Sequence, residues 1–140
     1  MKKWIGNFFA LALLVSIMAA CTNDNNGTPN NGTDDTLTTA GNWKVSYYWD
    51  KDKDETNDFS GYVFTFEKGG VFKAMKNGTT TTGTWQVNSS GTKLIINSGS
   101  TIKPLDDLSD DWIIVEKSDK LIKLKDDNDE HDEFLHFAVI

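Results

Sequence analysis

Four aspartates in the stretch WDKDKDETNDFSG (residues 49–61) have the spacing of ligands in a calcium-binding loop. They are Asp50, Asp52, Asp54 and Asp58, which match positions one, three, five and nine of an EF-hand loop. The match fails at Glu55, where the loop needs a glycine for its sharp turn, and at Gly61, where it needs a bidentate glutamate. The stretch therefore predicts either weak calcium binding or only an acidic turn between two strands.

A second acidic stretch, DDNDEHDE (residues 126–133), has a similar composition near the end of the chain, and the two stretches together carry eleven carboxylates. If they connect the first two and the last two strands of a closed antiparallel meander, they lie at one end of it as neighbours. We therefore expect a strongly acidic barrel mouth that binds divalent cations weakly or binds a basic protein partner. The alternative is two solvated loops that keep the protein soluble.

The remaining reactive side chains give little support for an enzyme. The chain has one cysteine and two histidines, and neither histidine stands beside a serine or carboxylate relay of the kind that nucleophilic catalysis requires. His131 lies within the second acidic stretch, whereas His136 is expected to point into solvent. The sequence contains no glycine-rich phosphate loop and no spaced zinc ligands. We expect a protein that is not an enzyme and that holds no cofactor beyond weakly bound calcium.

Short runs of alternating apolar residues, separated by turn sequences, fill the chain from Gly41 onward. The period of two is typical of half-buried strands, and Asn77-Gly78 is the strongest short hairpin signal. Eight strands are predicted, at 43–49, 62–67, 71–76, 79–87, 93–97, 111–117, 121–125 and 134–140. The connection at 98–110 is expected to hold one short helical turn. The pattern predicts an all-β fold, an eight-stranded antiparallel up-and-down barrel, because closure removes exposed edges; a sandwich is the alternative.

Strand alternation predicts which side chains fill the barrel. The expected inward set is Trp43, Val45, Tyr47, Phe64, Phe66, Phe72, Trp85, Val87, Leu94, Ile96, Trp112, Ile114, Ile122, Leu124, Leu135, Phe137 and Val139. Eight of these are aromatic, and an eight-stranded barrel has room only for side chains or for one small ligand. We expect either a mostly filled interior or a small apolar pocket near one mouth, with rim residues Tyr47, Trp49, Tyr62 and Met75.

The N-terminal residues carry a targeting signal. Lys2 and Lys3 precede an apolar run that ends at Ala20, directly before Cys21. The letters MAAC at the end of this run resemble the lipobox of bacterial lipoproteins. The resemblance implies cleavage before Cys21, a diacylglycerol on its sulfur and a third fatty acyl chain, such as palmitate, on the new N-terminus. Three chains anchor a protein far more firmly than one. The alternative is a short transmembrane helix over residues 4–20.

Three parts of the chain are expected: a signal peptide at 1–20, the lipidated Cys21 and a flexible Asn/Gly/Thr/Asp linker at 21–40, and a barrel domain at 41–140. Removing residues 1–20 takes away two lysines and changes the formal charge from −7 to −9. This charge argues against nucleic-acid binding. Thr22 is not the aspartate that retains some lipoproteins in the inner membrane. We therefore expect a lipid-anchored protein of the outer membrane, facing either the periplasm or the exterior.

Several short motifs of residues 41–140 resemble the lipocalin-like domains of small bacterial lipoproteins. They are Gly41-Asn42-Trp43, which matches the G-x-W signature, then Phe64-x-Phe66, Gly83-Thr84-Trp85 and W-I-x-V at 112–115. The resemblance implies that Trp43 closes the barrel floor and that a late cation packs across it. Because the sequence contains no arginine, that place would fall to Lys123 or Lys125.

Two functions are compatible with these observations. The first is a lipid-anchored barrel that binds a small hydrophobic ligand in the cell envelope. The second is a non-catalytic structural or protein-interaction lipoprotein with a packed core and an acidic mouth. Both contact the membrane through Cys21, and neither involves nucleic acid.

Overall fold

The computed structural model describes Leu37, residues 40–128 and residues 130–140. The predicted signal peptide, Cys21 and most of the predicted linker lie outside these residues. The elements are β1 (Asn42–Asp50), β2 (Lys53–Asp54), the 3₁₀ helix η1 (Thr56–Phe59), β3 (Val63–Glu67), β4 (Val71–Lys76), β5 (Thr79–Val87), β6 (Lys93–Asn97), the 3₁₀ helix η2 (Asp106–Leu108), β7 (Asp111–Lys117), β8 (Leu121–Asp126) and β9 (Glu133–Val139). Within the described part of the chain, neither helix is long and apolar enough to cross a membrane.

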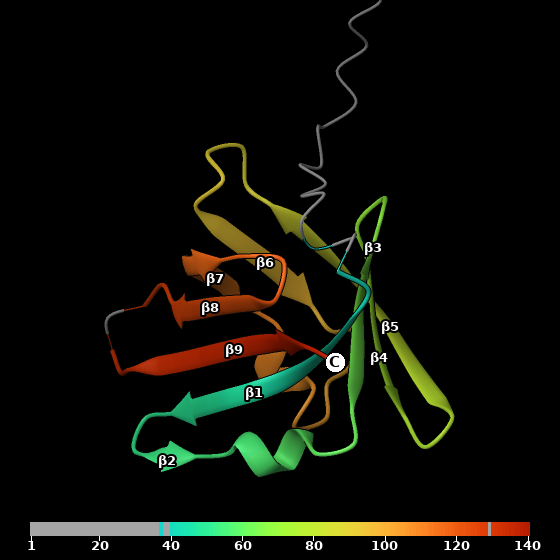
Figure 1. The fold of residues 1–140 in the computed structure, drawn as a ribbon. Coiled ribbons are helices and arrows are strands. Elements are labelled where there is room, and N and C mark those ends of the chain that lie inside the picture. Colours follow the sequence, from blue (N-terminus) through green and yellow to red (C-terminus); the bar gives the residue numbers. More distant parts are fainter. Residues whose placement is uncertain (1–36, 38–39, 129) are drawn as a thin grey trace, which may run out of the picture.

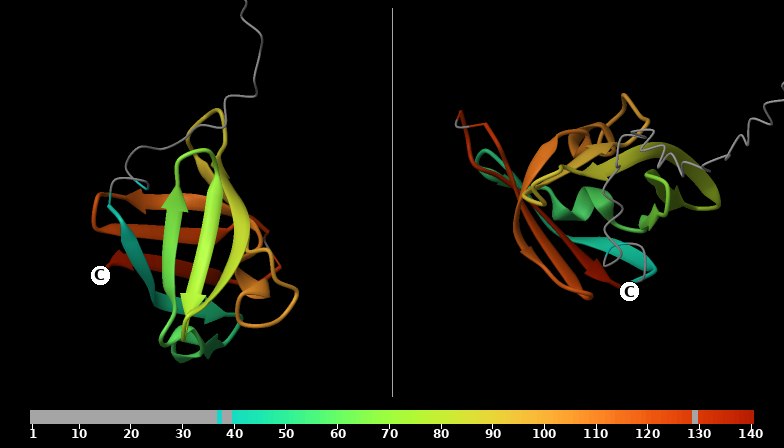
Figure 2. Two further views of the ribbon diagram at one scale, coloured as in Figure 1. Left: turned by 90° about the vertical axis from the view of Figure 1, so that its right-hand side faces the viewer. Right: turned by 90° about the horizontal axis from the view of Figure 1, so that it is seen from above.

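All strands except β2 form a closed antiparallel barrel, which confirms the predicted fold. Each strand of the series from β3 to β9 pairs with the next, β1 pairs with β3, and the pairing of β1 with β9 closes the sheet. Figure 1 shows β1, β9 and β8 as neighbours in one wall. The left view of Figure 2 shows β3, β4 and β5, in green and yellow-green, running steeply across the direction of the orange and red strands β8 and β9. The eight predicted strands all occur, with ends that differ by one residue at most, and η2 is the expected helical turn.

The barrel interior is filled by side chains. Phe64, Phe66 and Phe72 form a continuous aromatic group, with ring centroids 5.2 Å apart between Phe66 and Phe72 and 5.8 Å apart between Phe64 and Phe72. Phe137 from the opposite wall packs edge-on against Phe64 and against Phe66, at 5.5 Å in each case. These rings and the buried aliphatic residues around them belong to one hydrophobic cluster. The first of the two expectations for the interior, a mostly filled core, is therefore the one the structure supports.

One predicted inward residue was assigned to the wrong face. The pairing of β1 with β9 shifts by one residue between Val45 and Tyr47, which is a β-bulge. A bulge adds one residue to a strand and changes which face the following side chains point to. As a result Tyr48 is 1% exposed and lies in the core, whereas Tyr47 lies on the outer wall. The simple period of two cannot reveal such an insertion.

Residues outside the eight main strands close the ends of the core. Leu37, in the predicted linker, is buried, and its carbonyl accepts a hydrogen bond from the Trp43 indole at 3.3 Å. At the other end the Trp112 indole donates to the carbonyl of Leu108 in η2 at 3.0 Å. Phe59 of η1 packs edge-on against Tyr48, with ring centroids 5.1 Å apart. The core therefore extends beyond the strands, back to Leu37.

Candidate functional site

An open groove of about 340 Å³ lies on the outer wall of the barrel, over the neighbouring strands β7, β8, β9 and β1. Its lining residues are Tyr47, Val115, Lys123, Leu124, Phe134 and His136. Apolar and aromatic groups supply most of the lining, and a few polar groups interrupt it. This composition, and a volume near the lower end of the usual range, are typical of sites for small ligands.

Two β-bulges lie in the strands that form the groove. One is the bulge before Tyr47, and the other lies in the pairing of β7 with β8, between Ile114 and Glu116. Bulges redirect side chains and occur often beside functional sites. Val115 follows Ile114, which packs against the core, and stands on the outer surface, where it is 63% exposed. The second bulge places Glu116 beside Lys123 on the same face.

The polar groups of the groove form a row across three neighbouring strands. Tyr47 is paired with His136, and His136 is paired with Lys123. The rings of Tyr47 and His136 lie 4.9 Å apart between centroids, and Lys123 Nζ lies 2.6 Å from a carboxylate oxygen of Glu116. Burial, followed by the charge of Lys123, lowers the pKa of His136. Its imidazole is therefore neutral near pH 7 and offers one donor and one acceptor.

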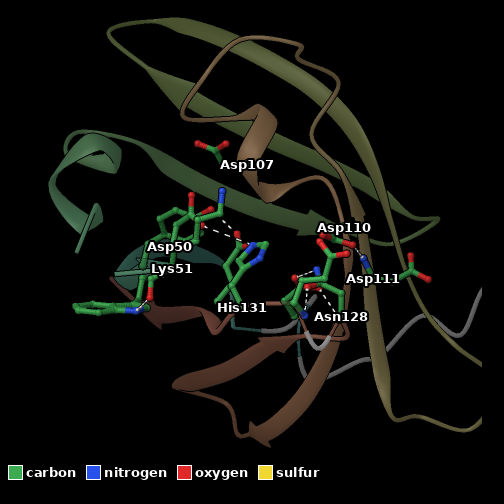
Figure 3. A network of polar contacts seen from close by, with 12 residues as sticks. Asp50, Lys51, Asp107, Asp110, Asp111, Asn128 and His131 are labelled. Atoms are coloured by element: carbon green, nitrogen blue, oxygen red, sulfur yellow. Dashed lines mark hydrogen bonds and ion pairs between the residues drawn. The ribbon is translucent and has the colours of Figure 1, made fainter. Parts of the chain in front are cut away.

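The two acidic stretches meet at one end of the barrel, as the closed meander predicts. Asp50 at the end of β1 is paired with Glu133 at the start of β9, and the Lys51 amide donates to the Asp132 carbonyl at 3.1 Å. Asp50, His131 and Glu133 each place one potential ligand atom within 4.8 Å of the other two. Figure 3 shows this part of the polar network, with the His131 side chain directed toward Asp50.

A buried phenol orients one of these carboxylates. The Tyr48 hydroxyl donates to Glu133 Oε1 at 2.5 Å. Burial, together with this bond and the charge of Glu133, raises the pKa of Tyr48 far above its usual range, so the phenol keeps its proton. Burial also raises the pKa of Glu133, although the bond from Tyr48 opposes that shift. Tyr48 therefore remains a hydrogen-bond donor, and its bond holds the Glu133 carboxylate in place at this end of the barrel.

A second group of carboxylates lies beside the first, and nearby side chains stabilise its negative charges. Asp110, Asp126 and Asp127 place ligand atoms within 4.8 Å of one another. Asp126 is 2% exposed and accepts hydrogen bonds from the amide and the side chain of Asn128. Lys93 forms an ion pair with Asp127. Burial raises the pKa of Asp110, although a bond from the Asp111 amide opposes the shift.

Among the four aspartates of the predicted calcium loop, only Asp50 belongs to such a group of described residues. The chain reverses directly after it in a tight hairpin, with Lys51 at a φ of 59°, and β2 pairs back onto β1. Asp52 is exposed in this turn. The Oδ1 atom of Asp54 accepts a hydrogen bond from the Thr56 amide at 3.0 Å, and Asp58 lies in η1. The local spacing of the aspartates therefore does not bring their carboxylates together.

The four residues expected around one pocket lie at separate places. Tyr47 lines the groove described above, and the nearby Trp49 donates its indole N–H to the Lys51 carbonyl at 2.9 Å. Tyr62 lines a different hollow beside η1, and Met75, which is 45% exposed, lines a third beside β3 and β5. The structure therefore does not gather these side chains around one pocket.

The residues of the G-x-W signature occupy the start of the barrel. Gly41 has a φ of 85°, which favours glycine, and Trp43 is fully buried with its ring 6.4 Å from that of Phe66. The expected cation across Trp43 was assigned wrongly. Lys123 pairs with Glu116 on the outer wall, and Lys125 pairs with Asp132 at 3.5 Å.

Several residues of both sites escaped the sequence analysis. Val115, Phe134 and His136 line the groove with Tyr47, but they come from different strands and share no local motif. Glu133 and Tyr48 were not recognised as partners because they are 85 positions apart. The pairing of β1 with β9 is the signal that relates Tyr47 to His136 and brings Tyr48 close to Glu133, but it does not reach Val115, which lies on β7.

The sequence matches no protein-family model, and no curated protein matches it at a significant level. One solved structure that is similar is the crystal structure at 1.00 Å resolution of a DUF4847 family protein from Bacteroides vulgatus ATCC 8482. The alignment covers 74% of this chain and 95% of that protein, with 17% sequence identity and a TM-score of 0.56. At this identity the similarity shows a shared fold and nothing about function.

Proposed function

We propose that this protein is a non-catalytic, lipid-anchored barrel of the cell envelope that binds a small apolar molecule in the groove on its outer wall. The acylated Cys21 is the proposed anchor, and the linker carries the barrel away from the membrane. The groove itself carries the proposal, because it combines exposed apolar side chains with a few polar groups on a rigid sheet.

The filled interior favours a site on the outer wall. The aromatic cluster around Phe64, Phe66 and Phe137 occupies the centre of the barrel. Opening a cavity there would separate these packed rings and would lose their burial energy, on the order of 2 kcal/mol for each large side chain exposed. The groove needs no such rearrangement, since it is open on the outer wall and Val115 is already 63% exposed.

Charge identifies the class of ligand. Lys123 is the cation of the groove, and it is already paired with Glu116 at 2.6 Å. The barrel domain is strongly acidic, so an anionic ligand would have to displace Glu116 and approach against the field of the whole protein. His136 remains as a neutral hydrogen-bonding group beside the Tyr47 ring. We therefore propose a flat, uncharged molecule with one hydrogen-bonding group.

The test is a titration of the full chain in lipid nanodiscs with the neutral fluorescent probe N-phenyl-1-naphthylamine. Two variants form a matched pair, because Val115 and Met75 are both exposed apolar residues on strands but only Val115 lines the groove. We expect saturable binding that Val115→Asp reduces at least tenfold and Met75→Asp leaves unchanged. Probe dissolved in the lipid contributes equally to all three proteins and can be subtracted.

Two results would overturn the proposal. One is the absence of a saturable component after subtraction. The other is an equal loss of binding in Val115→Asp and Met75→Asp, which would indicate nonspecific adsorption to any exposed apolar surface.

The acidic end of the barrel favours a second candidate, a protein-interaction lipoprotein that binds a basic partner. Two clusters of carboxylates lie side by side there, one around Asp50 and Glu133 and the other around Asp126. Such a surface attracts cationic segments strongly at low salt and weakly at high salt. This candidate predicts that an oligolysine peptide binds the chain with an affinity that falls steeply between 50 and 200 mM salt, at about the ionic strengths where screening becomes effective. Salt-independent affinity would reject it.

A further inference from the structure

We infer that Asp50, His131 and Glu133 bind a first-row transition-metal dication, with Zn²⁺ as the representative ion, at the acidic end of the barrel. This site lies apart from the groove and does not depend on ligand binding there. It is carried by the convergence of three different ligand groups and by the buried donor that fixes one of them.

The three ligands come together because the barrel closes. Asp50 and Glu133 are directly paired residues of β1 and β9, and His131 precedes Glu133 by two positions. The backbone bond between Lys51 and Asp132 ties the two turns together immediately beside them. Each of the three side chains is half-buried. A metal ion bound here would therefore be attached to two strands at the ends of the chain's barrel domain.

The distances leave space for an ion between the ligand atoms. His131 Nε2 lies 3.9 Å from Asp50 Oδ1 and 3.9 Å from Glu133 Oε2. These separations are too long for hydrogen bonds. In a tetrahedral zinc site, with metal–ligand distances of about 2.0–2.2 Å, neighbouring ligand atoms are roughly 3.3–3.5 Å apart. Closing the site requires His131 Nε2 to approach each carboxylate oxygen by only about half an ångström. The ligand atoms of Asp50 and Glu133 lie within 4.8 Å of each other, and rotation of the side chains can bring them closer.

The ligand types distinguish this site from a general acidic surface. Ca²⁺ takes six to eight oxygen ligands, whereas this group offers two carboxylates and one imidazole nitrogen. Imidazole is a preferred ligand of zinc, copper, iron and nickel. One histidine with two carboxylates therefore selects a transition metal over calcium, and water would complete the coordination.

Tyr48 supplies the outer contact that ordered metal sites use. Its buried hydroxyl binds Glu133 Oε1, and Oε2 of the same carboxylate is the atom nearest His131. A hydrogen bond to one oxygen thus holds the other in position, which is the role that outer residues play around metal ligands.

The test uses the two histidines of the chain as site and control. The full chain, without a histidine tag and with ¹⁵N-labelled histidine, is titrated with Zn²⁺ in detergent micelles and followed by imidazole ¹H–¹⁵N spectra. We expect the His131 signals to shift and saturate near one equivalent, while those of His136 stay in place. Calcium at the same concentration should not reproduce the shift. The inference is overturned if neither histidine responds to millimolar Zn²⁺, if both respond equally, or if Ca²⁺ gives the same shift.

Matched variants then identify the ligands. Asp50→Asn and Asp52→Asn remove the same charge from positions two residues apart, but only Asp50 belongs to the group. We expect Asp50→Asn to weaken Zn²⁺ binding by at least tenfold and Asp52→Asn to leave it unchanged. Tyr48→Phe should weaken it by about 10–100-fold, the usual effect of losing an outer hydrogen bond. Equal effects of the two aspartate variants would show diffuse attraction of cations and would contradict a defined site.

Discussion

Replacing Tyr48 by phenylalanine isolates a single hydrogen bond in the structure. The ring is 1% exposed and packs against Phe59, and phenylalanine keeps both the ring and its packing. The change removes only the hydroxyl that donates to Glu133 Oε1 at 2.5 Å. Glu133 then loses its buried donor. Water replaces that donor only in part, because the Glu133 side chain is only 13% exposed.

The expected cost follows from the charge on the acceptor. Hydrogen bonds to charged groups contribute about 1.5–3 kcal/mol, and Glu133 retains partial contact with water, so we expect a loss of about 2 kcal/mol in the free energy of unfolding. For a domain of about 100 residues, 1 kcal/mol corresponds to a change in Tm of about 4–8 °C. The Tm should therefore fall by roughly 10 °C.

The assay is urea unfolding of the full chain, followed by tryptophan fluorescence, with Tyr47→Phe as the control. Tyr47 lies on the outer wall, so loss of its hydroxyl should change stability by less than about 0.5 kcal/mol. The comparison also tests the β-bulge, because a strand without it would bury Tyr47 in place of Tyr48. Equal effects of the two changes, or a larger effect at Tyr47, would refute the reasoning.

Two further predictions concern the strands and the groove. A Cβ atom on Gly83 would lie 1.9 Å from the Asn97 carbonyl oxygen. Gly83→Ala should therefore force β5 and β6 apart and lower the free energy of unfolding, measured in urea, by about 3 kcal/mol. A loss no larger than that of Thr84→Ala, a change at an exposed neighbour, would contradict the close approach. Burial lowers the pKa of His136 from its usual value of 6.5. On acidification the unfolded chain therefore takes up the proton at a higher pH than the folded chain, and the free energy of unfolding should fall as the pH drops below about 6.5. His136→Gln should flatten this dependence between pH 7 and 5, and an unchanged slope would show that other groups cause it.

The positions of the strands could be predicted because their signals are local. Alternating apolar residues and turns such as Asn77-Gly78 identified all eight barrel strands, and closure followed from the need to cover two strand edges. The face of Tyr47 could not be predicted, because a bulge leaves no mark in the period of two. Phe59 and Leu37 were missed as core residues for a related reason, since single apolar residues in turns and linkers show no periodicity.

The candidate sites were only partly predictable. The meeting of the two acidic stretches followed from topology alone, since neighbouring turns of a closed meander share an end. Which carboxylates converge there could not be derived, because the local spacing of Asp50, Asp52 and Asp54 suggested a loop that the hairpin at Lys51 prevents. The groove depends on register between strands that are distant in sequence, and no run of consecutive residues encodes it.

The central claim is that the barrel interior is filled and that small molecules bind on its outer wall. Methyl NMR of the full chain in nanodiscs, titrated with N-phenyl-1-naphthylamine, tests this claim most directly. Val115 reports on the groove, whereas Leu94 and Ile96 are buried inside the barrel. We predict that the Val115 methyl signals shift and saturate while those of Leu94 and Ile96 stay unchanged. Saturable shifts of Leu94 and Ile96, with Val115 unaffected, would place the ligand inside the barrel and contradict the claim.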